Sequence, residues 1–187
     1  MRSKHIIAVC IAVVSLATAA SAATVAITPH TIAGAKLGKG AAAYKTMLGS
    51  RVHLDQPPNG FTDPDSYTRL VFPKRKMYVY FKDGIDRATI ITTWNKAYKT
   101  AAGIGPCSTV AELKQAYGSK LKPSKWSTQN GNTYVYTMGD LLFAAADLTQ
   151  VTAVGLYDSK APRANKEGGA LPFAGFIVQA PDQTPCS

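Results

Sequence analysis

The stretch Ala102–Gly118, AGIGPCSTVAELKQAYG, carries the strongest local structural signals of the chain. Thr109 and Glu112 have the T-x-x-E spacing of a capping box, in which each side chain bonds the other residue's free backbone N–H. Ser108 is a competing N-cap, so the start is open by one residue. The pattern predicts a helix over residues 110–117.

One face of this helix is apolar. Val110, Leu113 and Tyr117 fall at i, i+3 and i+7, while Lys114 points away from that face. Gly118 follows, where a glycine can take the left-handed conformation that ends a helix. A helix this short does not persist alone in water. We therefore expect it to lie on the strands that follow.

An earlier stretch, Ala33–Gly49 (AGAKLGKGAAAYKTMLG), resembles a degenerate copy of the first. It predicts a helix over residues 41–48, with Gly49 as its end. The core side of this helix would carry Tyr44, Met47 and Leu48.

Runs of β-forming residues follow each predicted helix. The predicted strands are residues 67–72, 76–81, 85–94, 126–129, 133–138, 141–146 and 151–157. Pro123 is expected to break the chain before the second set. Asp83-Gly84 and Asn130-Gly131 are hairpin turn signals, and such short turns cannot carry a parallel crossover. The fold class is therefore α+β, with two tandem repeats of a helix plus an antiparallel three- or four-stranded meander that can join into one continuous curved sheet.

The N-terminus has the features of a signal peptide. Arg2 and Lys4 precede the apolar run Ile6–Ala20, and Ala20-Ser21-Ala22 is a small-x-small cleavage site. We expect cleavage after Ala22, which leaves no membrane span in the mature form and a secreted, cell-envelope or periplasmic location. The alternative is an uncleaved anchor, because no charge interrupts residues 6–27.

The chain then divides into four parts. The predicted parts are the signal peptide (1–22), a first helix-plus-sheet repeat (23–101), a second (102–157), and a linker with a C-terminal tail (158–187). Residues 173–178 are an apolar run that can dock as an extra strand.

The mature chain is basic. Cleavage removes two of the 21 basic residues and none of the 11 acidic ones, which leaves a charge of +8. This charge favours acidic proteins, anionic envelope polymers or lipid headgroups as partners, with plain solubility as the alternative. No nucleic-acid-binding module is present, and export argues against such a partner.

Cys107 and Cys186 are the only cysteines of the mature chain. In an exported protein such a pair predicts a disulfide. The alternative is a catalytic thiol at Cys107, beside a helix N-terminus that stabilises a thiolate. That thiol needs a histidine, and the mature chain offers only His30 and His53.

No catalytic, metal or cofactor motif is present. Asp63 and Asp65 lack the further ligands of an EF-hand and suit turn chemistry better. Gly103-Ile104-Gly105 starts a dinucleotide-like pattern, but Ser108 occupies the third glycine position. We therefore expect a non-enzymatic protein without a cofactor, and a secreted hydrolase ranks third among our hypotheses.

Two pairs of strand tyrosines are candidates for binding. Tyr78 and Tyr80 are two residues apart, as are Tyr134 and Tyr136, so each pair shares one sheet face. Two short helices have enough apolar surface to cover one face of a sheet. We expect the four rings to line the other, exposed face and to contact a partner, the alternative being that they pack beneath the helices.

Leu37-Gly38 before a helix that ends at Leu48-Gly49 resembles the pattern of small outer-membrane assembly lipoproteins. Two such units, each followed by a meander, resemble the β-lactamase inhibitory protein family over roughly residues 30–157. The resemblance implies one curved sheet whose concave face grips a protein. Lys39-Gly40 replaces the family's helix-opening methionine-threonine, and no inhibitory residue can be matched.

The run 103–109 also looks like exported bacterial proteins of no assigned activity. The function we expect is an exported, inhibitor-like or scaffold-like module that binds an unknown protein partner through the sheet face. The alternative is a basic protein that binds a cell-envelope polymer.

Overall fold

The structure is a computed structural model that describes residues 26–49, 53–55, 67–82, 86–128, 131–145 and 148–158, together with Lys160 and Cys186. Its elements in chain order are β1 (Ile27–Thr28), β2 (Thr31–Ile32), α1 (Ala41–Leu48), β3 (His53–Asp55), β4 (Tyr67–Phe72), η1 (Pro73–Arg75), β5 (Met77–Lys82), β6 (Ala88–Thr93), α2 (Val110–Tyr117), η2 (Gly118–Lys120), β7 (Lys122–Thr128), β8 (Gly131–Met138), β9 (Leu141–Ala145) and β10 (Ala153–Tyr157).

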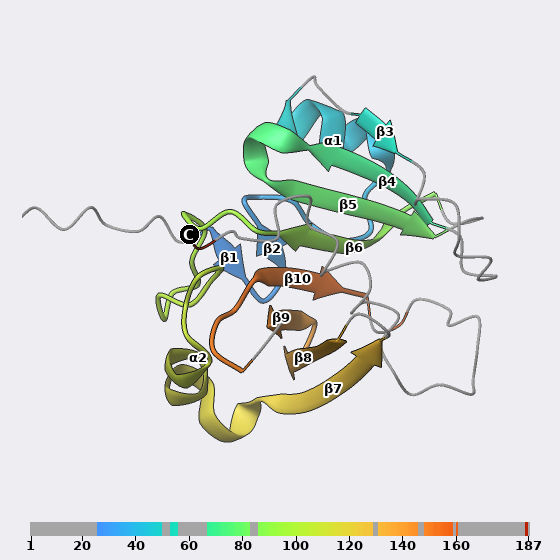
Figure 1. The fold of residues 1–187 in the computed structure, drawn as a ribbon. Helices are drawn as coiled ribbons and strands as arrows, with labels where there is room; N and C mark the ends of the chain where they lie inside the picture. The colour runs from blue at the N-terminus through green and yellow to red at the C-terminus, as the bar shows by residue number, and fades with distance from the viewer. Residues whose placement is uncertain are drawn as a thin grey trace, which may run out of the picture.

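Eight of the strands form one antiparallel sheet in the order β3-β4-β5-β6-β10-β9-β8-β7. The last strands of the two meanders, β6 and β10, pair in the middle, from Thr93↔Val154 to Ile90↔Tyr157. Figure 1 shows α1 beside β3 and β4 and α2 in the other half of the sheet. The predicted α+β class with antiparallel strands is confirmed.

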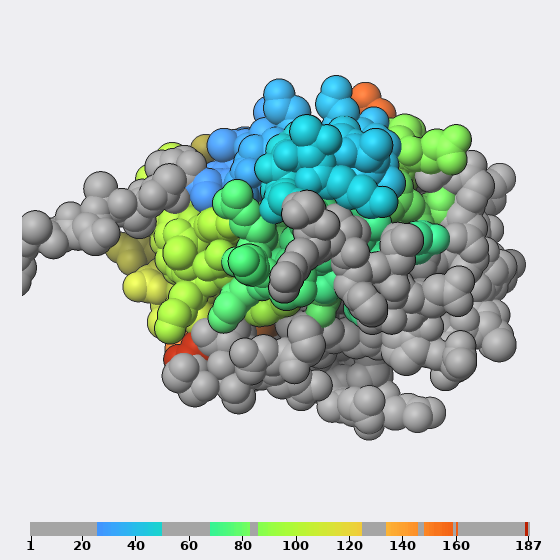
Figure 2. Space-filling model, turned by 90° about the horizontal axis from the view of Figure 1, so that it is seen from above, coloured from blue at the N-terminus to red at the C-terminus, as the bar shows by residue number. Residues whose placement is uncertain are grey.

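Both helices pack on the same face of this sheet. Tyr44 and Leu48 of α1, and Val110 and Leu113 of α2, belong to one cluster of buried side chains. The separate hairpin of β1 and β2 contributes to the same cluster, and Figure 2 shows it (blue) against α1 (cyan). We call this the helix-side face.

The opposite face of the sheet is also buried, and we call it the outer face. It carries a second cluster of buried side chains, to which no residue of either helix belongs. The members of this cluster are Tyr78, Tyr80, Ile90, Trp94, Val135, Leu142, Ala144, Ala153 and Tyr157. The expectation of one exposed sheet face is therefore wrong.

Both predicted helices are confirmed with their bounds, because their ends are set by local chemistry. Thr109 is the N-cap: its hydroxyl accepts a hydrogen bond from Glu112 N, and its own N–H donates to the Glu112 carboxylate. At the other end Gly118 has φ 50° and ψ −128°. The positive φ favours glycine, although the residue is outside the left-handed helical region that we expected.

Pro123 does not break the chain, which corrects the expectation above. It lies within β7, opposite Tyr136 of β8. β7 ends the sheet order, and an edge strand tolerates a residue that cannot donate a hydrogen bond. The strand therefore begins at Lys122, four residues before the predicted start.

The predicted disulfide is confirmed. Cys107 and Cys186 are bonded, with a sequence separation of 79 residues and Cα atoms 5.2 Å apart. The N–H of Cys107 donates to Val151 O, which fixes this residue beside the start of β10. The bond therefore ties Cys186 to the loop before α2. The predicted strand at 173–178 lies outside the described residues.

Candidate functional site

A groove of about 620 Å³ opens where α2 meets the β7 edge of the sheet. Its lining comes from the end of α2, from η2 and the start of β7, from β8, and from the loop before β10. The lining residues are Lys114, Gly118, Leu121, Pro123, Ser124, Tyr134, Tyr136 and Leu148. We call this site the α2–β7 groove.

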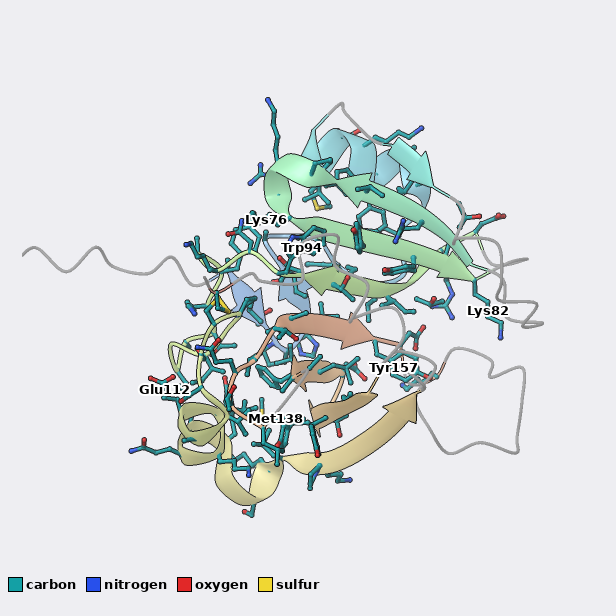
Figure 3. All side chains as sticks on the ribbon, viewed as in Figure 1. Lys76, Lys82, Trp94, Glu112, Met138 and Tyr157 are labelled. Carbon is teal, nitrogen blue, oxygen red and sulfur yellow. A yellow bond between two sulfur atoms is a disulfide. The ribbon has the colours of Figure 1, made fainter. Side chains whose placement is uncertain are left out.

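Strand β8 forms the aromatic wall of the groove. Tyr134 and Tyr136 are two residues apart, so both project to the helix-side face. Met138 continues this row, and Figure 3 shows it between α2 and β8. Burial, and to a smaller extent the neighbouring Tyr134, raises the pKa of Tyr136 above the ordinary tyrosine value.

Lys114 supplies the positive charge of the groove. Its Nζ lies 5.7 Å from the centroid of the Tyr136 ring, within the range of a cation–π contact. The side chain is exposed, one turn from the end of α2. No acidic residue is among the lining residues that the structure describes. Glu112, on the outer side of α2 in Figure 3, is hydrogen-bonded to Thr109.

Leu148 forms the exposed apolar rim. It is 55% exposed, and the other large hydrophobic side chain exposed in the described part of the chain is Met47 of α1, at 41%. Leu148 therefore leaves an apolar surface in water beside a mostly apolar groove.

The four tyrosines predicted to line one exposed face lie on opposite faces of the sheet. Tyr78 and Tyr80 are 3% and 1% exposed in the outer-face cluster, whereas Tyr134 and Tyr136 pack with the helix-side cluster. The geometric prediction is wrong because the strand register aligns Tyr78 with Thr137 of β8 across β6, β10 and β9, which places the tyrosines of β8 on the opposite face. A binding role for any of the four stays a prediction.

Tyr78 and Tyr80 instead belong to a packed aromatic row. The ring centroid of Tyr78 is 4.4 Å from that of Trp94 and 6.0 Å from that of Tyr80. The guanidinium carbon of Arg69 lies 4.6 Å from the Tyr78 ring centroid. These contacts explain the burial of the pair and give it a structural role.

Three other features that could give the described residues a function are metal-ligand clusters, membrane-spanning helices and a free thiol. Nowhere in these residues do three or more histidine, cysteine or acidic side chains gather where they could hold a metal ion. Among the same residues, neither helix is long and apolar enough to cross a bilayer. Cys107 is disulfide-bonded, so its sulfur is not a free thiol in this state.

Sequence reasoning proposed two of the eight described lining residues, Tyr134 and Tyr136, for binding and missed the other six. Among these six, Lys114 was placed away from the apolar face of its helix, Pro123 was interpreted as a chain break, and Leu148 was given no role. An isolated leucine in the polar run Asp147-Leu148-Thr149-Gln150 was the one available signal. Comparisons with protein-family profiles, curated proteins and solved structures find no match for this chain.

Proposed function

We propose that the mature chain is an exported, non-enzymatic binding protein that contacts a protein partner through the α2–β7 groove. The observation that carries the proposal is the groove itself, with tyrosine, proline and leucine around it and Leu148 exposed at its rim. Tyrosine is favoured at interfaces because it buries a large ring while keeping a polar tip.

The order of elements supports a tandem repeat and the resemblance to the β-lactamase inhibitory protein family. A helix followed by four strands occurs twice, as α1 with β3–β6 and α2 with β7–β10. The two sets meet through their last strands, so the sheet order is symmetric about the β6–β10 junction. The buried outer face differs from the open concave face that the resemblance implies, which is why the groove takes that role here.

Affinity capture tests the proposal. The mature protein, beginning at Ala23, is immobilised and exposed to culture supernatant and envelope extract, beside its Leu148→Ser variant. Met47→Ser on α1 is the matched control, because Met47 is the other exposed large hydrophobic residue of the described chain. We expect one protein on the wild type and the control that is lost from Leu148→Ser. Equal recovery on all three would overturn the groove as the contact surface.

Binding of an anionic envelope polymer is the second candidate. It is favoured by the basic turn η1, where Lys74 and Arg75 are exposed, and by the charge of +8 after removal of residues 1–22. Binding of this kind weakens steeply with salt. Retention by an anionic polymer column that falls in Lys74→Gln/Arg75→Gln, and is unchanged in Leu148→Ser, would favour this alternative.

A further inference from the structure

We infer that the α2–β7 groove takes a short acidic peptide segment of the partner, with an apolar side chain inserted between Tyr136 and Leu148. This inference rests on the proposed function and names the chemistry of the segment that is bound. It follows from the shape of the groove, from its charge and from the strand at its edge.

The apolar lining of the groove indicates that the inserted side chain is apolar. Leu121, Pro123 and the two tyrosines present mainly carbon to the interior of the groove, and Leu148 extends this surface into solvent. An apolar side chain that leaves water here gains about 25 cal/mol per Å² of buried area. A chain of sugar hydroxyls or phosphates would gain little from the same walls, which favours a peptide over an envelope polymer.

The positive charges at the groove indicate that the bound segment is acidic. Lys114 lines the groove, and Lys120 is exposed between the lining residues Gly118 and Leu121. No described acidic residue lines the groove to offset these cations. A carboxylate beside the inserted side chain would pair with Lys114, whose Nζ already lies over the Tyr136 ring.

The edge strand favours side-chain insertion over strand addition. β7 ends the sheet order, and an open edge can add a strand from another protein. Pro123 has no N–H and lies on this edge beside the groove, so the ladder would lack a donor there. We therefore place the peptide in the groove and not along the edge of the sheet.

Peptide titrations test this inference on the full mature protein. The probes are three labelled hexapeptide pools, followed by fluorescence anisotropy: Asp/Glu with Phe and Leu, Asn/Gln with Phe and Leu, and Asp/Glu with Ala alone. We expect at least tenfold tighter binding of the first pool than of either other pool. Weak binding of all three, or equal binding of the two pools with Phe and Leu, would overturn the acidic, apolar assignment.

Two variants locate the binding. Lys114→Gln should weaken the first pool about fivefold and should reduce its salt dependence, because one charge contact is lost. The matched control is Lys45→Gln: Lys45 O accepts the bond from the helix-ending Gly49 N–H, as Lys114 O does from Gly118. Equal effects of the two changes would place the peptide elsewhere, provided that circular dichroism shows both variants folded.

The outcomes separate the two proposals. If a protein is captured through Leu148 but the acidic pool does not bind, the function stands and the chemistry of the segment is wrong. If neither the capture nor the peptide binding depends on the groove, both proposals fail. If Lys114→Gln weakens binding of the first pool but no protein is captured, the peptide site stands and the proposed protein partner is contradicted.

Discussion

At the scale of single residues, the two pairs of strand tyrosines offer one clear contrast in burial, between Tyr80 and Tyr134. Tyr80 is 1% exposed and lies in the outer-face cluster, whereas Tyr134 is partly buried and lines the groove. A fully buried ring loses its packing contacts and leaves a cavity when it is truncated. A partly exposed ring leaves space that water can fill.

Tyr80→Ala is therefore expected to lower the free energy of unfolding by about 3–5 kcal/mol. Tyr134→Ala should cost clearly less, because part of its ring is already in contact with solvent. Urea denaturation followed by circular dichroism measures both values. A near-zero change for Tyr80→Ala would mean that this ring lies on an open surface, as the sequence alone had suggested.

Tyr44 predicts a dependence of stability on alkaline pH. Burial raises the pKa of its hydroxyl from 10.0 to about 12, and this hydroxyl donates to Lys36 O. The unfolded chain therefore loses this proton first as pH rises. The contribution of the protonated Tyr44 hydroxyl to folding stability is fully present below about pH 10 and is lost as pH rises through about 12.

The expected result is that Tyr44→Phe loses about 1 kcal/mol at pH 7, where the hydrogen bond is removed, and less at high pH. Urea denaturation between pH 7 and 11.5 on wild type and variant tests this. A stability difference that stays constant across that range would mean that the Tyr44 hydroxyl is not buried in the folded state.

At the scale of elements, the two short helices depend on their ends. Thr109 caps α2 by accepting a hydrogen bond from Glu112 N at 3.1 Å. The backbone N–H of Thr109, and then its side chain, lower the pKa of Glu112. The contribution of the Glu112 carboxylate to folding stability is therefore present above the usual glutamate pKa and is lost as pH falls through the lowered pKa.

Thr109→Ala is expected to destabilise the protein by about 1 kcal/mol, the typical value of a lost N-cap. The matched control is Thr46→Ala in α1, where the hydroxyl only donates back to Ala42 O within the helix and whose removal should change stability by less than about 0.5 kcal/mol. Thermal unfolding of the two variants decides the matter. Equal losses of stability in the two variants would mean that the capping box does not stabilise α2.

Elements with local signals could be predicted from the sequence, and those decided by spatial neighbours could not. The capping box fixed the start of α2, and Gly49 and Gly118 marked where both helices end. The start of β7 depends on that strand lying at the edge of the sheet, which its own residues do not specify. Residues 53–55 form β3 by pairing with β4, and too few apolar residues lie there to predict a strand.

The candidate site was harder to predict for the same reason. The tyrosine pairs were placed correctly on strands, but their faces depend on the pairing register across the sheet, which aligns Tyr78 with Thr137 and not with Tyr136. Lys114 meets Tyr136 because α2 packs on the sheet, and Leu148 joins them because its loop is hydrogen-bonded to the start of α2 through Thr149 O. Lys114 and Leu148 are 34 residues apart in the chain, and no periodic pattern in the sequence links the two positions.

At the scale of the whole molecule, one covalent bond closes a long part of the chain. The disulfide spans 79 residues, and the loss of loop entropy in the unfolded state gives at most about 4.5 kcal/mol. We expect the Cys107→Ser/Cys186→Ser variant to unfold at clearly lower urea concentration than the oxidised wild type. The control is wild type in reductant, which should match the variant. Two reactive thiols in the freshly exported protein would contradict the bond.

Across the whole surface, we place the partner at the α2–β7 groove and not on the outer face of the sheet. The measurement that tests this most directly is site-specific photo-crosslinking in the exporting cell, with benzoylphenylalanine at position 148 or, as the control, at position 47 on α1. Both positions are exposed, so the probe should be accessible at each. We predict a discrete protein adduct from position 148 and none from position 47. No adduct at 148, or the same adduct from both positions, would contradict the groove as the binding surface.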